Sequence, residues 1–110
     1  MTSLIGCVIL YSNKVTMSIN NKKTTELFQA ILTLGNIQEA KMFFADLLTG
    51  QEIDEFGNRW YSARMLADGI SYVEIEKETG LSSTTIARIS KCLKKGKRGY
   101  KTIIKKLSIF

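Results

Sequence analysis

Apolar residues recur along this chain at intervals of three and four, which is the spacing of one face of an α-helix. The pattern is clearest over residues 27–32, 37–48 and 53–67, and it returns over 100–107. The apolar positions are Leu27, Phe28, Ile31 and Leu32, then Ile37, Ala40, Phe43, Phe44, Leu47 and Leu48, then Ile53, Phe56, Trp60, Ala63 and Ala67, and finally Tyr100, Ile103, Ile104 and Leu107. The chain is therefore predicted to be all-α.

Polar pairs three residues apart mark where three of these helices begin. In each pair the first side chain would cap the helix, and the glutamate would reach back to the backbone of the capping residue. The pairs are Asn36 with Glu39, Thr49 with Glu52 and Ser71 with Glu74. Gly35, Gly69 and Gly80 stand where the apolar periods stop, a place where a left-handed residue often follows a helix. We predict about six helices, near residues 24–34, 37–48, 50–68, 72–79, 83–93 and 98–108.

The segment between residues 71 and 93 reads as a short helix, a turn at "TGL" and a second helix. Ile75, Leu81, Ile86 and Ile89 are spaced so that both helices close over one apolar seam, which is typical of a helix-turn-helix. The second helix of such a unit enters the major groove and reads base edges near its N-terminus. We expect helix 82–93 to read bases with small side chains, namely Ser82, Ser83, Thr84, Thr85 and Ala87.

Charge is distributed unevenly along the chain, whose formal net charge is +6. Residues 1–80 carry 7 basic and 10 acidic side chains, whereas residues 81–110 carry 9 basic and none acidic. A basic block beside a reading helix would neutralise DNA phosphates, which supplies most of the nonspecific affinity. The expected phosphate-binding residues are Arg88, Lys91, Lys94, Lys95, Lys97 and Arg98. The sequence thus predicts double-stranded DNA as a partner.

Other classes of protein find little support in the sequence. The chain has no histidine and two cysteines, Cys7 and Cys92, without a CxxC pair, so we expect no metal site of the Cys/His type. It also lacks a Gly-rich phosphate loop, and most carboxylates fall on caps or exposed faces, so we expect no enzymatic activity. Residues 4–11 are apolar but far shorter than the roughly 20 residues that span a bilayer. We expect a cytoplasmic protein with reduced thiols and no membrane partner.

The helix signals start just after Met17, and they divide the chain into two parts. We interpret residues 1–20 as an N-terminal extension that is either disordered or, over residues 1–16, an overlong gene start, and residues 21–110 as the helix-turn-helix domain. The apolar stripes of the first two predicted helices are wide for so small a body. Such a surplus is most simply buried against a second copy, so we expect a homodimer.

A family resemblance rests on six segments in a fixed order. They are "LFQAILTLGN", "FFADLLT", "EIDEFGNRW", "DGISYVEIEKETG", "STTIARISKCL" and "GKRGYK". With these segments the chain resembles the Trp-repressor-like YerC/YecD family of bacterial proteins from about Glu26 to Leu107. The resemblance implies an all-α fold in which the N-terminal helices of two chains interlock. It also implies two reading heads for a two-fold operator, roughly 34 Å apart.

The same resemblance points to an effector pocket, but one residue argues against its use. In the tryptophan repressor the amino acid lies between the third helix and the reading helix, at positions that match Thr49, Arg59, Thr85 and Arg88. The next position is glycine in that repressor and Ile89 here, and its branched side chain should fill the slot. We therefore expect no tryptophan co-repressor and no other cofactor.

These observations favour a sequence-specific DNA-binding regulator of transcription that acts as a repressor. The alternative is a module that binds nucleic acid without sequence preference, or that uses the helix-turn-helix to contact a protein. Fold-level patterns alone do not separate the two.

Overall fold

A computed structural model describes residues 19–108, which form six helices and no strand. In chain order these are α3 (Lys22–Ile31), α4 (Ile37–Leu47), α5 (Gly50–Ala67), α6 (Tyr72–Thr79), α7 (Ser83–Lys95) and α8 (Gly99–Ser108). The predicted all-α class is confirmed, and the predicted helix bounds agree to within three residues. The interpretation of residues 1–16 lies outside the described residues, as does most of the predicted extension.

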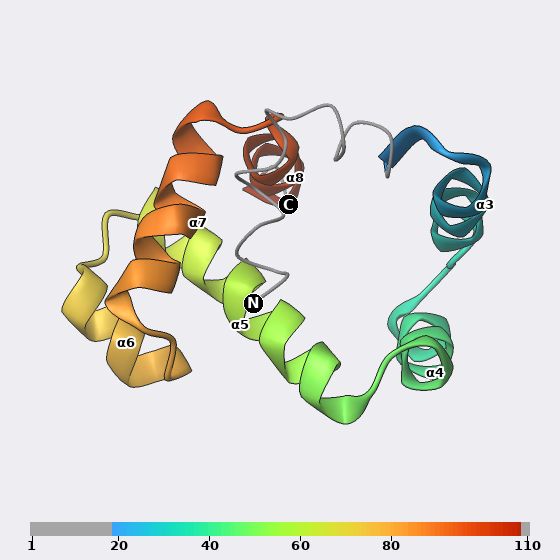
Figure 1. The fold of residues 1–110 in the computed structure, drawn as a ribbon, viewed down its shortest axis with the longest axis horizontal. Helices are drawn as coiled ribbons and strands as arrows, with labels where there is room; N and C mark the ends of the chain where they lie inside the picture. The colour runs from blue at the N-terminus through green and yellow to red at the C-terminus, as the bar shows by residue number, and fades with distance from the viewer. Residues whose placement is uncertain (1–18, 109–110) are drawn as a thin grey trace.

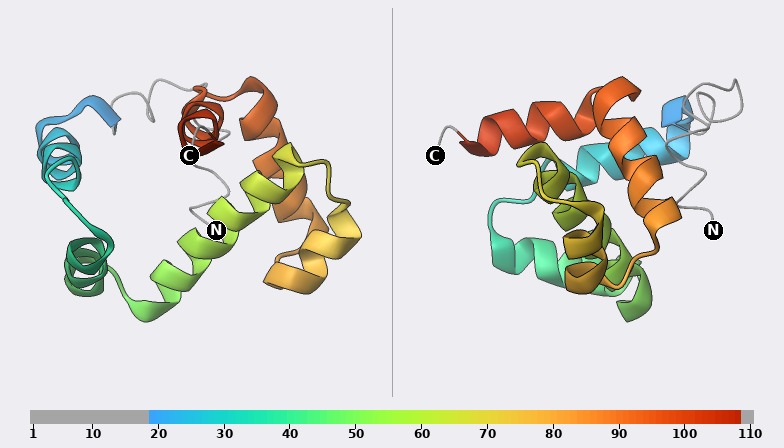
Figure 2. Two further views of the ribbon diagram at one scale, coloured as in Figure 1. Left: turned by 180° about the vertical axis from the view of Figure 1, so that it is seen from behind. Right: turned by 90° about the vertical axis from the view of Figure 1, so that its left-hand side faces the viewer.

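The helices divide into an arm and a head. In the two opposed views of Figures 1 and 2, α3 and α4 lie at one side of the molecule, and α6, α7 and α8 gather around the other end of α5. Helix α5 packs against both α6 and α7, while α3 is not packed extensively against any other described helix. We call α3 and α4 the arm, and α5 to α8 the head.

Each predicted cap residue begins its helix, but among the described pairs the predicted return contact from the glutamate to the cap backbone is made by Thr49 and Glu52 alone. Thr49 Oγ1 accepts a hydrogen bond from Glu52 N at 3.1 Å, and Thr49 N donates to the Glu52 carboxylate at 2.9 Å. Ser71 Oγ caps α6 by accepting from Glu74 N at 3.2 Å. The pair that starts α4 differs, because the Glu39 carboxylate accepts from Gly35 N rather than from the N-cap residue.

Two of the three glycines behave as the sequence predicted. Gly69 and Gly80 have positive φ angles of 82° and 75°, whereas Gly35 does not, so the prediction for Gly35 is wrong. The reason is that α3 ends earlier, at Ile31, and its last turn is closed by Thr33. The backbone N–H and the hydroxyl of Thr33 both donate to Ala30 O, at 3.0 and 2.7 Å.

The apolar core lies where α5, α6 and α7 meet. Ala63, Ile75, Ile86 and Ile89 are its buried apolar side chains among the described residues. This confirms the predicted seam between the two helices of the helix-turn-helix, with Leu81 half-buried at its edge. Burying a side chain of this size stabilises a fold by about 1.5–3 kcal/mol, so each isoleucine contributes a large share of the head's stability.

The last helix is fixed to the head by aromatic packing. The rings of Trp60 on α5 and Tyr100 on α8 lie with centroids 6.2 Å apart and planes inclined by 34°. Burial raises the pKa of the Tyr100 phenol above its ordinary value, and the nearby Arg59 guanidinium partly opposes that shift. Tyr100 therefore anchors α8 in its neutral form.

The cysteines depart from the expectation of reduced thiols. Cys92 on α7 is disulfide-bonded, so the prediction is wrong for this residue. Cys7 lies outside the described residues. The prediction rests on the expected cellular compartment and on the spacing of the cysteines, and neither of these shows which residues the fold brings together.

The raised pKa of Tyr100 predicts an alkaline loss of stability. Because the folded state holds the phenol proton more tightly than the unfolded chain, this contribution is complete below the unfolded pKa and is lost as pH rises through the folded pKa. Tyr100→Phe keeps the ring and should flatten the decline in unfolding free energy between about pH 9 and pH 11, measured by denaturant titration. The control is Tyr72→Phe, which changes an exposed tyrosine; its unfolding free energy should decline with pH as that of wild type does. An unchanged decline in the Tyr100 variant would contradict the assignment.

Candidate nucleic-acid interface

The turn between α6 and α7 is tight and internally bonded. Gly80 follows α6 in the left-handed conformation, and its N–H donates to Glu76 O at 2.8 Å. The Thr79 hydroxyl donates to Ile75 O at 2.7 Å and accepts from Leu81 N at 3.2 Å. Any other residue type at position 80 would be strained by the positive φ. The turn therefore sets the orientation of α7 relative to α6.

The five predicted base-reading residues divide into two groups at the start of α7. Ser82 is the N-cap and accepts from Thr85 N at 3.2 Å, and the two hydroxyl oxygens lie 3.1 Å apart. These two residues hold the end of the helix. Ser83, Thr84 and Ala87 are exposed instead, and they form a row of small side chains along the outer face of α7. We call these three residues the reading row.

The predicted phosphate-binding residues continue from the reading row toward the end of α7. Lys91, Lys94 and Lys95 are exposed on the helix, and Lys97 and Arg98 are exposed in the turn that follows, whereas Arg88 is half-buried. No acidic residue lies between Gly80 and the end of α8. The outer face of α7 is therefore cationic without interruption.

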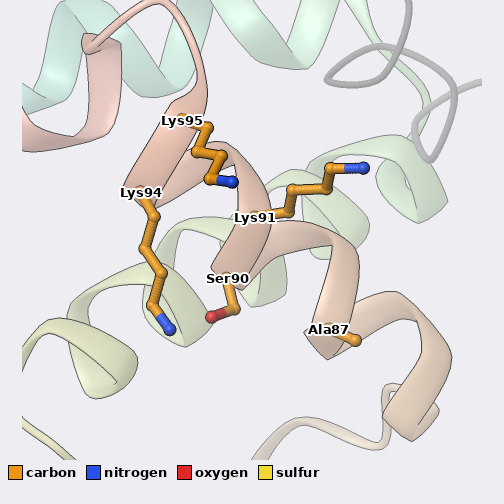
Figure 3. A pocket seen from close by; sticks show the side chains of 5 residues that line it. All are labelled: Ala87, Ser90, Lys91, Lys94 and Lys95. Carbon is orange, nitrogen blue, oxygen red and sulfur yellow. The ribbon is translucent and has the colours of Figure 1, made fainter.

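A pocket lies on the same helix, between the two sets of predicted residues. It has a volume of about 330 Å³ and is lined by Ala87, Ser90, Lys91, Lys94 and Lys95. Figure 3 shows the side chains of Ser90 and Lys94 extending to the same side of α7. Ser90 was not among the residues predicted from the sequence. Its spacing, three residues after Ala87 and four before Lys94, places it on the face they share and could have identified it.

The turn between α7 and α8 is strained. Arg98 has a φ of 71° and is the one described residue other than glycine with a positive φ. Before it, Gly96 is closely packed, since an added Cβ would lie 2.5 Å from Cys92 O. A left-handed conformation costs an ordinary residue about 1 kcal/mol or more. The backbone of Arg98 thus adopts this conformation at an energetic cost.

Within one chain, Thr49 of the expected effector pocket lies far from Arg59. Thr49 is the N-cap of α5, ten residues before Arg59, which corresponds to about 15 Å along the helix. The Arg59 guanidinium lies over the Phe56 ring, 4.8 Å from its centroid. Thr85 and Arg88 are half-buried on α7.

Ile89 lies beside these residues on α7 and is part of the core, with 4% of its surface exposed. A buried branched side chain leaves no space at its own position. The absence of a tryptophan co-repressor stays a prediction.

Among residues 19–108, no cluster of three or more His, Cys, Asp or Glu side chains could hold a metal ion. No helix in that same range combines the length and the apolar character needed to cross a bilayer.

Comparison with known proteins identifies relatives of this chain. A family model described as Trp repressor protein matches residues 22–108. The chain is 42% identical over 82 residues to the uncharacterized protein YerC of Bacillus subtilis strain 168, an alignment that covers 74% of this chain and 79% of that protein.

Two crystal structures have the same fold. A TrpR-like protein from Eubacterium eligens superposes with a TM-score of 0.79 at 34% identity, covering 84% of this chain and 96% of the other. A protein provisionally named a Trp repressor from Staphylococcus aureus has a TM-score of 0.78 at 38% identity, with coverage of 84% and 93%.

The backbone strain at Arg98 predicts an unusual response to glycine. Arg98→Gly should raise the unfolding free energy, by up to about 1 kcal/mol, because glycine adopts the left-handed conformation without strain. Lys97→Gly removes the same charge from the neighbouring residue, which has no positive φ, and should lower stability through unfolded-chain entropy. The stabilities of both variants and wild type are compared by thermal unfolding. Equal destabilisation by the two would show that Arg98 stores no strain.

Proposed function

Because the chain belongs to the Trp repressor family, we propose that it is a transcriptional regulator that binds specific sites in double-stranded DNA. The observation that carries this proposal is the outer face of α7, where the exposed reading row runs into an exposed cationic surface without an acidic residue. Short polar side chains near the N-terminus of such a helix can approach base edges, whereas a long hydrophobic side chain there would block the duplex and an acidic one would repel it.

In this proposal α7 lies in the major groove and the reading row supplies the sequence preference. The hydroxyls of Ser83 and Thr84 can donate to or accept from base edges, and the Ala87 methyl can contact a thymine methyl. Ser82 and Thr85 act indirectly, because their mutual contacts hold the first turn of α7 in place. The apolar seam beneath α7 keeps the row at a constant angle to the rest of the head.

The cationic residues supply affinity rather than sequence preference. Lys91, Lys94, Lys95, Lys97 and Arg98 would lie beside backbone phosphates that flank the groove. Contacts to phosphates position a protein on the duplex but carry no direct sequence information. A duplex bound in this way would be inaccessible to other proteins, so we assign the regulator the role of a repressor, acting on the chromosome in the cytoplasm. The burial of Ile89 supports repression without tryptophan as co-repressor.

We further propose that the regulator is a homodimer whose arms interlock. The arm contains no buried residue, although it carries large apolar side chains such as Leu32, which is 84% exposed, and Phe28. Isolated helices of ten or eleven residues are marginal in water, so α3 and α4 need a partner surface. A second copy offers the same apolar surface and would carry a second reading head.

A nonspecific nucleic-acid-binding module is the second candidate. The basic block of residues 81–110 favours it, because phosphate neutralisation alone can bind any duplex. The two candidates differ in sequence preference, which the following experiment measures.

Sequence preference should depend on the reading row and not on the lysines. A duplex selected from a random library should bind wild type about a thousandfold tighter than a scrambled duplex at physiological salt, measured by fluorescence anisotropy. Ser83→Ala and Thr84→Ala should each reduce that ratio about tenfold. Lys94→Ala should weaken binding to both duplexes alike. It should also lower the slope of log affinity against log salt concentration by about 0.9 per subunit. Equal affinity of wild type for selected and scrambled duplexes would contradict specific recognition.

The arm should determine the oligomeric state. Leu32 is exposed in a single chain, so the charge introduced by Leu32→Asp would cost little in a monomer. In an interlocked dimer the same charge would be buried and would destabilise the interface. We expect sedimentation to show loss of the dimer, with reduced helicity. Val73→Asp on α6 is the control, since Val73 is also strongly exposed but lies outside the arm, and that variant should remain dimeric. A Leu32 variant with the mass of a wild-type dimer would refute the arm interface.

A further inference from the structure

A second pocket lies between the C-terminal ends of α5 and α8. It has a volume of about 170 Å³ and is lined by Arg64, Asp68, Ile104, Leu107 and Ser108. Arg64 is in the last turn of α5 and Asp68 is its C-cap, whereas the other three residues belong to the second half of α8. None of the five belongs to the reading row or to the predicted phosphate-binding residues. The proposed function therefore gives this pocket, which we call the α5–α8 pocket, no role.

The α5–α8 pocket carries one cation and one anion that do not pair with each other. Arg64 and Asp68 are four residues apart, so they lie on the same face of α5, about 6 Å apart along its axis. Their order, with the cation nearer the N-terminus, is the less favourable one for an ion pair at this spacing. No ion pair joins either side chain to another residue in the range 19–108. The pocket thus offers a positive and a negative charge separately.

The carboxylate of Asp68 lies at the end of α5 where a negative charge is unfavourable. The C-terminal end of a helix carries the negative pole of its dipole, which favours cations and disfavours a carboxylate. Glu52 illustrates the opposite case, because it lies in the first turn of the same helix and completes the capping box there. Helix α8 also ends at the α5–α8 pocket, with Ser108 as its last residue. A cationic group bound beside Asp68 would relieve the unfavourable charge.

The wall of the pocket on α8 is aliphatic. Ile104 is half-buried, whereas Leu107 has 52% of its surface exposed. The Ser108 hydroxyl donates to Lys105 O at 2.8 Å, which leaves its oxygen as an acceptor. A volume of about 170 Å³ is about six times the share of one water molecule in the liquid, which suits a small organic molecule. A matching ligand carries an anionic group, a cationic group and a small aliphatic group.

We propose that the α5–α8 pocket binds a free α-amino acid with a small aliphatic side chain. Arg64 binds the ligand carboxylate, for which the planar guanidinium offers two parallel N–H donors. Asp68 accepts hydrogen bonds from the ligand ammonium group, and the ligand side chain covers Ile104 and Leu107. The bound amino acid would join the end of α8 to α5, the helix against which α6 and α7 pack. This site shares no residue with the effector pocket expected from the family resemblance, and no contact with DNA enters it.

Calorimetric titration with L-valine, without DNA, tests the two charge contacts. Wild type should bind L-valine saturably and should bind isovalerate, which lacks the amine, at least about tenfold more weakly, because one hydrogen-bonded charge pair is lost. Asp68→Asn should bind L-valine as weakly as wild type binds isovalerate and should no longer distinguish the two compounds, since both changes remove the same interaction. Arg64→Gln should behave in the same way toward isobutylamine, which lacks the carboxylate.

The matched controls remove one charge from each of the same two helices. Asp54→Asn on α5 and Lys101→Gln on α8 change exposed residues that do not line the α5–α8 pocket. Both variants should bind L-valine like wild type. Thermal unfolding establishes that all four variants are folded. Wild-type affinity of Asp68→Asn for L-valine would overturn the assignment of the ammonium group, and equal binding of L-valine and isovalerate by wild type would overturn it as well.

Amide chemical shifts recorded by NMR during the same titration locate the ligand. L-Valine should shift the amides at the ends of α5 and α8, around Asp68 and Leu107. Shifts concentrated around Thr85 and Arg88 would place the amino acid in the effector pocket expected from the family resemblance and would overturn the inference. Absence of saturable binding to wild type would overturn it too. Because no step uses DNA, each of these outcomes leaves the proposed function intact.

Discussion

The angle at which α7 leaves the head depends on one small apolar seam. Ala63 on α5, Ile75 on α6, and Ile86 and Ile89 on α7 are its buried members, and the left-handed Gly80 closes the turn beside them. These contacts use the inward positions of α7 and leave the outward positions to small polar and basic side chains. Deleting most of one buried isoleucine side chain typically costs 2–5 kcal/mol, so the seam has little redundancy. The geometry proposed for reading DNA and the stability of the head would therefore depend on the same residues.

The arm has the opposite character, because its apolar side chains are not buried within one chain. Leu32 and Ile37 are far more exposed than any residue of the seam, and α3 has little support from the head. In the proposed dimer these residues become the core, so folding of the arm and pairing of the reading heads would be one event. Stability would then depend on protein concentration, as it does for obligate dimers.

Much of this fold could be predicted because short stretches of sequence determine where its helices begin and end. Apolar periodicity and the Thr49 and Ser71 caps located α5 and α6 to within one residue, and the isoleucine spacing located the seam. The predictions that were wrong or missing concern features that the local sequence does not determine. Gly35 resembled a helix terminator, but Thr33 had already closed α3. The disulfide bond of Cys92 and the positive φ of Arg98 are not determined by the residues next to them in the sequence.

The candidate site shows the same division. The exposure of Ser83, Thr84 and the lysines followed from helical spacing, whereas the inward half of the helix was harder to read. Ser90 is buried next to Ile89, and its place in the lining of the pocket beside Ala87 and Lys94 was not predicted. Thr49 and Arg59 were grouped through a family pattern, yet one chain separates them along α5, so a pocket containing both requires a second copy.

The central claim is that two copies of this head read one two-fold site. Hydroxyl-radical footprinting of the protein on its selected duplex tests it most directly, since it reports backbone protection nucleotide by nucleotide. The account predicts two protected half-sites related by two-fold symmetry, with centres roughly 34 Å apart on one face of the duplex. A single asymmetric protected segment, or uniform protection without half-sites, would contradict it.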